Sequence, residues 1–106
     1  LGTNVITNTT IASSGDDNVN VQNLSSTAGT LTITGGSFNT GVQGSGLLFG
    51  SRNTANLTVN ISGATINNNF SGGIVADGFD TATLIVRANN NTITNNNDGV
   101  ALSANN

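Results

Sequence analysis

The amino-acid sequence predicts an all-β fold: a right-handed parallel β-helix of about four coils, with three short strands in each coil and no capping helix. The first observation is an eight-residue segment that returns four times, at intervals of about 27 residues. The second is that apolar and polar residues alternate in its strands, where β-branched residues are frequent. The third is a constant spacing from the last strand of one coil to the first strand of the next. Repeats of this length bury their apolar sides only by stacking on one another.

The first two strands of each coil come from the repeated segment. Residues 31–38 (LTITGGSF), 59–66 (VNISGATI) and 86–93 (VRANNNTI) align without a gap, and residues 4–11 (NVITNTTI) form a weaker fourth copy. Each copy begins with an alternating strand. It continues through a step rich in glycine or asparagine, residues that tolerate the positive φ of a tight corner. A second short strand follows, centred on Ile11, Phe38, Ile66 and Ile93.

The third strand recurs at 19–21 (VNV), 47–49 (LLF), 74–76 (IVA) and 100–102 (VAL). A glycine precedes it at Gly46, Gly73 and Gly99, and Asn18 stands at that place in the first coil. The next coil begins ten steps after this strand (21 to 31, 49 to 59, 76 to 86), whereas the corner before it takes nine, eight and seven steps (38 to 47, 66 to 74, 93 to 100). This pattern indicates one domain, 1–106, with coils at about 4–30, 31–58, 59–85 and 86–106.

The predicted interior consists of columns in which like side chains lie over like, at the ladder spacing of about 4.8 Å. The first strand supplies Ile6, Leu31 or Ile33, Val59 or Ile61, and Val86; the second supplies Ile11, Phe38, Ile66 and Ile93; the third supplies Val19, Leu47, Ile74 and Val100, with Val21, Phe49, Ala76 and Leu102. Asparagine clusters at 67–69, 89–91 and 95–97 fall at the corners, where we expect amides to hydrogen-bond between coils. A polar comb that binds sugar or ice is the alternative.

The composition limits the choice of partners. Only 7% of the residues are charged, the formal net charge is −3, and Arg52 and Arg87 are the only cations, so no basic surface for nucleic acid or an anionic membrane is expected. The sequence has no cysteine, which excludes disulfides and thiolate metal sites, and no apolar run of membrane-spanning length. Because the chain starts at Leu1 rather than Met, we expect a processed, secreted or excised segment.

A resemblance to a known group adds to these observations. The segments LTITGGSF, LTVNISGATINNNFSGGIVA and LIVRANNNTITNNNDGVAL resemble the right-handed parallel β-helix repeats of bacterial autotransporter passengers, filamentous adhesins and secreted polysaccharide-active β-helix proteins. The resemblance covers essentially the whole chain. It implies a secreted or bacterial cell-surface location, and it leaves adhesion, fibre building and carbohydrate cleavage as the activities to compare.

The residues argue against cleavage. The resemblance to polysaccharide lyases implies a carboxylate cluster for calcium and an Arg or Lys base. Arg87 lies at an outward position, but its stacked equivalents Val5, Thr32 and Asn60 supply no carboxylate. Asp17 and Asp98 share a phase three coils apart, roughly 14 Å by ladder spacing, too far for paired carboxylate chemistry. We therefore expect no enzyme activity, no catalytic residue, no bound metal and no cofactor.

Two surface features are weaker candidates. Asp77 and Asp80, in the sequence Asp-Gly-Phe-Asp, form a candidate corner for a cation or a partner, although a simple turn explains them as well. An ice-binding face is also considered, because one column of hydroxyls precedes the second-strand column: Thr10, Ser37, Thr65 and Thr92. A single column is not a two-dimensional array, so this function is less favoured.

The coil pattern reaches both ends of the sequence, and uncapped coil ends expose strand edges and apolar columns. The candidate end-to-end contact residues are Leu1, Val5, Ile6, Val100 and Leu102. Continuing the ten-step spacing from Leu102 gives position 112, and the Asn4 of a directly following copy would fall at 110. We therefore expect a non-catalytic extracellular structural or adhesive module, a fibre subunit or stalk segment. Its expected partners are copies of itself, flanking coils of a longer parent chain, or surface glycans.

Overall fold

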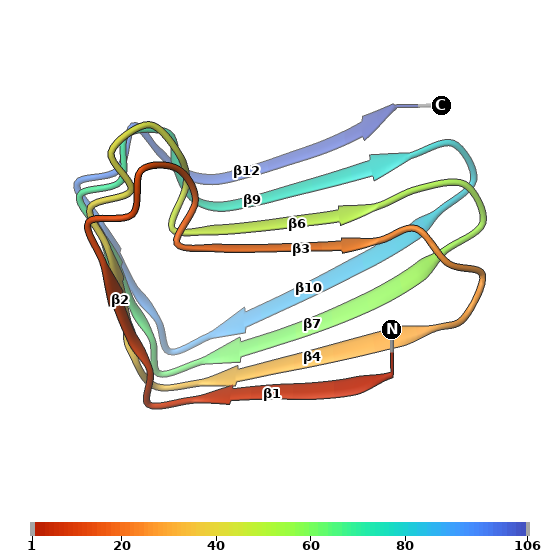
Figure 1. Ribbon diagram of the computed structural model, residues 1–106, viewed down its shortest axis with the longest axis horizontal. Coiled ribbons are helices and arrows are strands. Elements are labelled where there is room, and N and C mark those ends of the chain that lie inside the picture. Colours follow the sequence, from red (N-terminus) through yellow and green to blue (C-terminus); the bar gives the residue numbers. More distant parts are fainter. Residues whose placement is uncertain (1, 106) are drawn as a thin grey trace.

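The computed structural model describes residues 2–105, and in this range every regular element is a β-strand. The chain passes through three sheets in turn and then returns to the first sheet one coil further along (Figure 1). In Figure 1 it turns clockwise as it recedes from the viewer, which is the right-handed sense usual for parallel connections. The predicted right-handed parallel β-helix of about four coils is confirmed.

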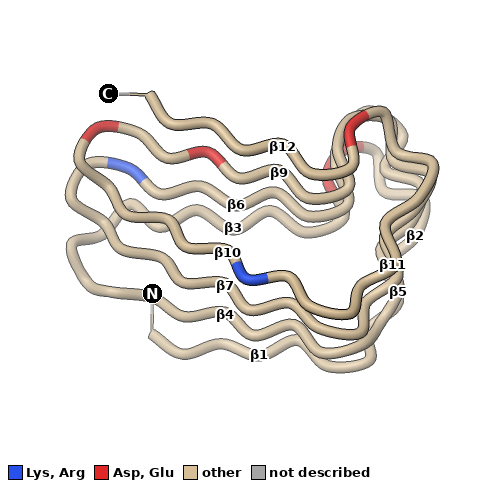
Figure 2. Tube along the Cα trace, turned by 180° about the vertical axis from the view of Figure 1, so that it is seen from behind, with Lys and Arg blue, Asp and Glu red and all other residues tan. Residues whose placement is uncertain are grey.

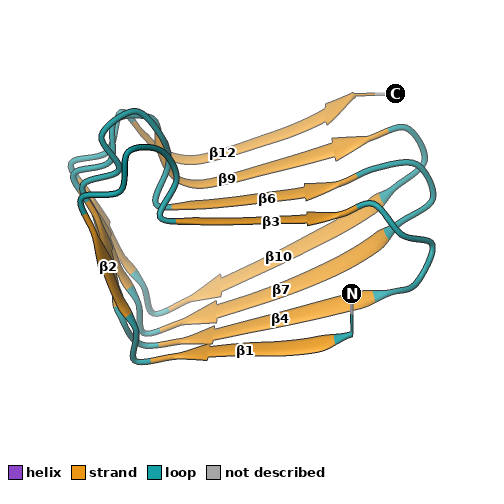
Figure 3. Cartoon of the chain, in the orientation of Figure 1, coloured by secondary structure: helices purple, strands orange, loops and turns teal. Residues whose placement is uncertain are grey.

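Each coil contributes one strand to each of three four-stranded parallel sheets. The first sheet contains β1 (Thr3–Thr7), β4 (Gly29–Thr34), β7 (Asn56–Ser62) and β10 (Thr83–Asn89). The second contains the short strands β2 (Thr10–Ala12), β5 (Ser37–Asn39), β8 (Thr65–Asn67) and β11 (Thr92–Thr94). The third contains β3 (Val19–Asn23), β6 (Leu47–Ser51), β9 (Gly72–Phe79) and β12 (Asp98–Asn105). The corners between the sheets are loops and turns (Figure 3).

The strand register confirms the predicted columns of the second and third strands. Ile11 pairs with Phe38, Phe38 with Ile66, and Ile66 with Ile93. The third-strand columns are also in register, from Val19 through Leu47 and Ile74 to Val100. In the first sheet the predicted residues form two columns, because Ile6 is in register with Ile33 and Ile61, whereas Val86 is in register with Val59 and Leu31. The sequence left two inward positions open in each middle coil of this sheet, and the structure buries both of them: Leu31 with Ile33, and Val59 with Ile61. It also buries Leu57 and Ala55, which the predicted columns did not include.

Burial depends on position along the axis. Phe38 and Ile66, in the two middle coils, are fully buried, whereas Ile11 and Ile93 in the end coils are only partly buried. At the C-terminal end Val100 is 54% exposed and Leu102 is 71% exposed. The cause is geometric, because a side chain in an end coil has a neighbouring coil on one side only.

Positive φ angles recur in register at the corners. The corner after the first strand has Asn8, Gly35, Gly63 and Asn90 in this conformation. The corner after the second strand has Ser13, Thr40, Asn68 and Asn95. Asparagine and glycine adopt this region at low cost, which is why the sequence places them at the first of these corners. Each coil therefore makes its turns at equivalent residues.

Candidate functional site

A chain of hydrogen-bonded asparagine side chains, which we call the amide ladder, runs parallel to the axis at the corner between the second and third sheets. Asn18 and Asn69 are buried, and Asn96 is partly buried. The Asn18 side chain donates to Oδ1 of Asn69 at 2.8 Å, the Asn69 side chain donates to Oδ1 of Asn96 at 2.8 Å, and the Asn96 side chain donates to the carbonyl of Ile66 at 3.1 Å. Oδ1 of Asn96 also accepts the backbone N–H of Asn69 at 3.0 Å. The expected hydrogen bonding of asparagines between coils is confirmed at this corner, and it satisfies backbone groups that would otherwise be buried without partners.

Glycines make room for these amides. A Cβ at Gly46 would lie 2.8 Å from Nδ2 of Asn69, and a Cβ at Gly73 would lie 2.8 Å from Nδ2 of Asn96. Between the first and second coils the two residue types are exchanged: Asn18 of the first coil replaces the glycine, and Gly41 of the second coil occupies the position equivalent to Asn69. Each step between coils therefore holds one asparagine side chain and one glycine.

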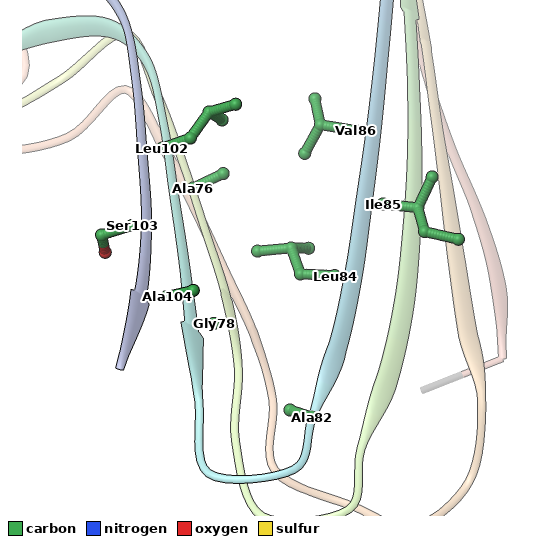
Figure 4. A pocket seen from close by; sticks show the side chains of 9 residues that line it. All are labelled: Ala76, Gly78, Ala82, Leu84, Ile85, Val86, Leu102, Ser103 and Ala104. Carbon is green, nitrogen blue, oxygen red and sulfur yellow. The ribbon is translucent and has the colours of Figure 1, made fainter. Parts of the chain in front are cut away.

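The C-terminal end face leaves the corresponding space open. Gly99 is equivalent to Gly46 and Gly73, but no atom lies within 4 Å of the position that its Cβ would take. At the same end of the solenoid, a cavity of 430 Å³ opens between β10 and β12. Leu84 and Val86 point into this space toward Leu102, whereas Ile85 points away (Figure 4). We call this surface, formed by Leu84, Val86, Gly99, Val100 and Leu102, the C-terminal end face.

The N-terminal end of the solenoid, which we call the N-terminal end face, has a smaller cavity than the C-terminal end face. A cavity of 290 Å³ is lined by Asn4, Val5, Ile6, Val21 and Leu31. Ile6 lies inward in register with Ile33, whereas Val5 pairs with Thr32 on the outward side. Two of the candidate contact residues, Ile6 and Val5, therefore border this face, as Val100 and Leu102 border the other. The remaining candidate, Leu1, lies outside the described residues.

The candidate cation corner is occupied by contacts between coils. The hydroxyl of Ser103 donates to Oδ1 of Asp77, and the backbone N–H of Asn53 donates to Oδ2 of Asp80 at 3.1 Å. The nearby Phe79 ring lies 4.0 Å from the guanidinium carbon of Arg52, a cation–π contact. Among residues 2–105, no three or more acidic, histidine or cysteine side chains gather in a group that could hold a metal ion.

The charged residues are scattered over the coils, as Figure 2 shows. Arg87 is exposed on β10, and its register partner on β7 is Asn60, as expected from the sequence. The carboxylate of Asp17 accepts hydrogen bonds from the backbone of Ser45 at 2.8 Å and from the Asn20 side chain at 2.9 Å. Through these hydrogen bonds Asp17 stabilises the corner between the second and third sheets.

The second sheet carries two outward columns. The hydroxyl column of Thr10, Ser37, Thr65 and Thr92 is in register. The column two residues further on holds Ala12, Asn39, Asn67 and Thr94, a mixture of side chains. The face therefore has one uniform column and one irregular column.

A groove at the corner between the second and third sheets was not predicted as a site. It has a volume of 450 Å³ and is lined by Thr40, Gly41, Val42, Asn68, Asn69, Phe70 and Asn95, which together form what we call the corner groove. Phe70 is 70% exposed and Val42 is 54% exposed. The signal in the sequence was the variable length of this corner, combined with an aromatic residue within an asparagine-rich segment.

Comparison of the chain with protein families, curated proteins and solved structures finds no match. Within residues 2–105, no helix is long and apolar enough to cross a membrane. The coils, their register and the amide ladder define a parallel β-solenoid repeat protein.

Proposed function

We propose that this chain is a non-catalytic structural segment of an extracellular fibre or adhesin stalk, and that its end faces join further coils of the same type. The proposal depends on one observation, the composition of the C-terminal end face. It combines the unpaired edges of β10, β11 and β12 with the exposed apolar side chains of Val100 and Leu102. Exposed parallel strand edges and unfilled apolar columns are a template for another coil.

The open space at Gly99 supports the same proposal. At Gly46 and Gly73 the equivalent space is filled by an asparagine from the next coil. A further coil with asparagine at that corner would extend the amide ladder by one step. A second copy of this chain would bring Ser14 to the same position, because the carbonyl of Ser14 pairs with Val42 as that of Gly41 pairs with Phe70. A further coil with asparagine and a second copy of this chain with Ser14 would therefore both place a polar group in the open space at Gly99.

The extracellular and adhesive parts of the proposal rest on composition and on the resemblance to secreted β-helix repeats. A chain with 7% charged residues and no cysteine is suited to a mechanical and surface-presenting role, in which register and packing matter more than reactive groups. The alternative, cleavage of an acidic polysaccharide with Arg87 as the base, has no carboxylate in register with Arg87 to hold calcium. Incubation with pectin, alginate and glycosaminoglycans tests this alternative, and cleavage lost in Arg87→Ala would favour it.

The main experiment measures self-association of the purified chain by sedimentation velocity and negative-stain electron microscopy over a range of concentrations. We expect rods that lengthen with concentration, since head-to-tail contacts that do not close form filaments. Gly99→Val and Leu102→Lys should abolish the rods, because each places a new group at the C-terminal end face. Val42→Lys is the matched control, since Val42 is exposed on a middle coil.

A tandem fusion tests the same surface when the added coils are covalently attached. Two residues inserted between the copies restore the ten-step spacing of the coils. If the end faces join, the tandem will unfold in one transition at higher denaturant concentration than the single chain. A compact monomer at all concentrations, together with a tandem that unfolds like the single chain, would contradict the proposal.

A further inference from the structure

The corner groove arises because neighbouring corner loops differ in length. The backbone N–H of Phe70 donates to the carbonyl of Gly41, and the next N–H, of Ser71, donates to the carbonyl of Gly44, each at 3.0 Å. Residues 42 and 43 lie between these two acceptors, and because the corner of the second coil is one residue longer than that of the third, they bulge out of the ladder. On the other side of Phe70, the corner of the fourth coil is one residue shorter than that of the third. The Phe70 ring is thus left uncovered by the coils on both sides.

The floor of the groove is held in place by the amide ladder. The buried side chain of Asn69 accepts hydrogen bonds from Asn18 and from the backbone N–H of Gly41, both at 2.8 Å. Its Nδ2 donates to Asn96 and, at 3.2 Å, to the carbonyl of Phe38. A residue with this many internal bonds cannot move freely, so the backbone that carries Phe70 is fixed before any ligand arrives. A preformed site loses less conformational entropy on binding.

The rim of the groove offers free polar groups. Asn68 and Asn95 are exposed, each with a φ of 55°, and within the described part of the chain their side chains make no hydrogen bond that would occupy them. Thr40, in the same column, adds a hydroxyl. An amide presents both donors and acceptors, and this is what a neighbouring pair of hydroxyls on a ligand requires.

The absence of charge in this lining narrows the ligand class. None of the seven lining residues of the corner groove is ionisable, so the groove has no group to neutralise a phosphate, sulfate or carboxylate. Its volume of 450 Å³ lies within the usual range of about 300 to 1,000 Å³ for small-ligand sites. A pyranose ring has an apolar C–H face and a rim of hydroxyls, which matches one exposed aromatic ring flanked by free amides.

We propose that the corner groove binds a neutral glycan. Phe70 packs against the C–H face of a sugar ring, Val42 covers its edge, and the amides of Asn68 and Asn95 hydrogen-bond to its hydroxyls. This site lies on the side of the second, third and fourth coils and shares no residue with either end face, so it stays accessible if both end faces are covered. The inference is independent of end-to-end joining, and the two can succeed or fail separately.

Affinity electrophoresis in gels that contain β-glucan, galactomannan or galactan tests the inference, with alginate and heparin gels as charged counterparts. We expect retardation by at least one neutral polysaccharide. Phe70→Ala should weaken it by about tenfold or more, since loss of about 1.4 kcal/mol of contact is a factor of ten. The double variant Asn68→Gly with Asn95→Gly should also weaken it, because glycine keeps the positive φ and removes the amides. Leu24→Ala and Asn90→Gly are the matched controls, an exposed apolar residue and an exposed positive-φ asparagine elsewhere on the chain.

Circular dichroism of each variant separates lost binding from lost folding. If Phe70→Ala does not fold, chemical-shift mapping by NMR on the unmodified, assigned chain with an oligosaccharide of the retarding polymer replaces it, and the perturbed signals must then include the Phe70 ring. Three results of the electrophoresis would overturn the inference. These are no retardation by any neutral polysaccharide, equal retardation of the unmodified chain and Phe70→Ala, or retardation by the charged polymers alone. A change in sedimentation of Phe70→Ala without a change in glycan binding would also overturn it, because it would identify a protein contact.

Discussion

Alanine substitutions at Gly73 and Gly99 test the stacking of the coils with a built-in control. Both glycines are the second residue of a strand in the third sheet, Gly73 in β9 and Gly99 in β12, and neither has a positive φ. A Cβ at Gly73 would lie 2.6 Å from Cγ2 of Ile93, 2.7 Å from the carbonyl of Gly99 and 2.8 Å from Nδ2 of Asn96. A Cβ at Gly99 would meet no atom within 4 Å.

The expected magnitudes follow from these distances. Contacts about 1 Å shorter than ordinary packing force the next coil to shift, and overpacking of this kind costs about 1–3 kcal/mol. Replacing glycine by alanine also restricts the unfolded chain, which stabilises the fold by about 0.4–1 kcal/mol where no strain results. Because this second contribution is common to both variants, their difference in unfolding free energy isolates the contact between coils. We expect Gly73→Ala to be about 1–3 kcal/mol less stable than Gly99→Ala.

Urea denaturation followed by far-ultraviolet circular dichroism measures this difference, at concentrations low enough to keep the chain monomeric. Equal midpoints and slopes for the two variants would refute the reasoning, because the fourth coil would then not lie over the third at Gly73. A Gly99→Ala variant that loses stability only at high concentration would instead agree with coils joining at the C-terminal end face.

Three further predictions concern the core, the ladder and the cations. Phe38→Ala should lower the free energy of unfolding by about 3–5 kcal/mol, because the Phe38 ring is fully buried between coils, whereas Ile93→Ala, in the partly buried end coil, should lower it by less than about 2 kcal/mol. Similar losses for the two variants in urea titrations would contradict the axial gradient of burial. Asn69→Ala should lower the free energy of unfolding by about 2–4 kcal/mol because it leaves buried partners unpaired, whereas Asn97→Ala, at an exposed residue, should change it by no more than about 0.5 kcal/mol. Thermal unfolding compares the two variants, and an unchanged stability of Asn69→Ala would show that the amide ladder does not support the corner. Arg52→Ala should lower the free energy of unfolding by about 0.5–1 kcal/mol because it removes the contact with Phe79, whereas Arg87→Ala should change it by less than about 0.5 kcal/mol. The reverse order in chemical denaturation would be inconsistent with the observed cation–π geometry.

The sequence predicted the fold well because each coil repeats the same physical solution. Ile11, Phe38, Ile66 and Ile93 stand at one phase of the repeat, and in a parallel ladder equal phase means direct stacking. The ten-step spacing set the register of the first and third strands in the same way. Asn18 in place of a glycine was visible in the sequence, but its hydrogen bond to Asn69 depends on the direction in which each side chain leaves its corner.

The candidate sites were harder to predict. The corner groove depends on which residues of two unequal loops pair, and the bulge at residues 42 and 43 emerges only from the bonds of Phe70 to Gly41 and of Ser71 to Gly44. Asp77 and Asp80 suggested a cation corner from their spacing alone, yet their carboxylates accept hydrogen bonds from Ser103 and Asn53 of adjacent coils. A repeat determines the position of a residue along the axis, and it says little about loops that depart from the repeat.

The stacking of the second-strand column is the central claim, and nuclear Overhauser contacts between its side chains test it most directly. With the methyl groups and the Phe38 ring assigned, we expect contacts from Ile11 to Phe38, from Phe38 to Ile66 and from Ile66 to Ile93, and none from Ile11 to Ile93. Missing contacts between Phe38 and Ile66, or a direct contact between Ile11 and Ile93, would contradict the four-coil solenoid.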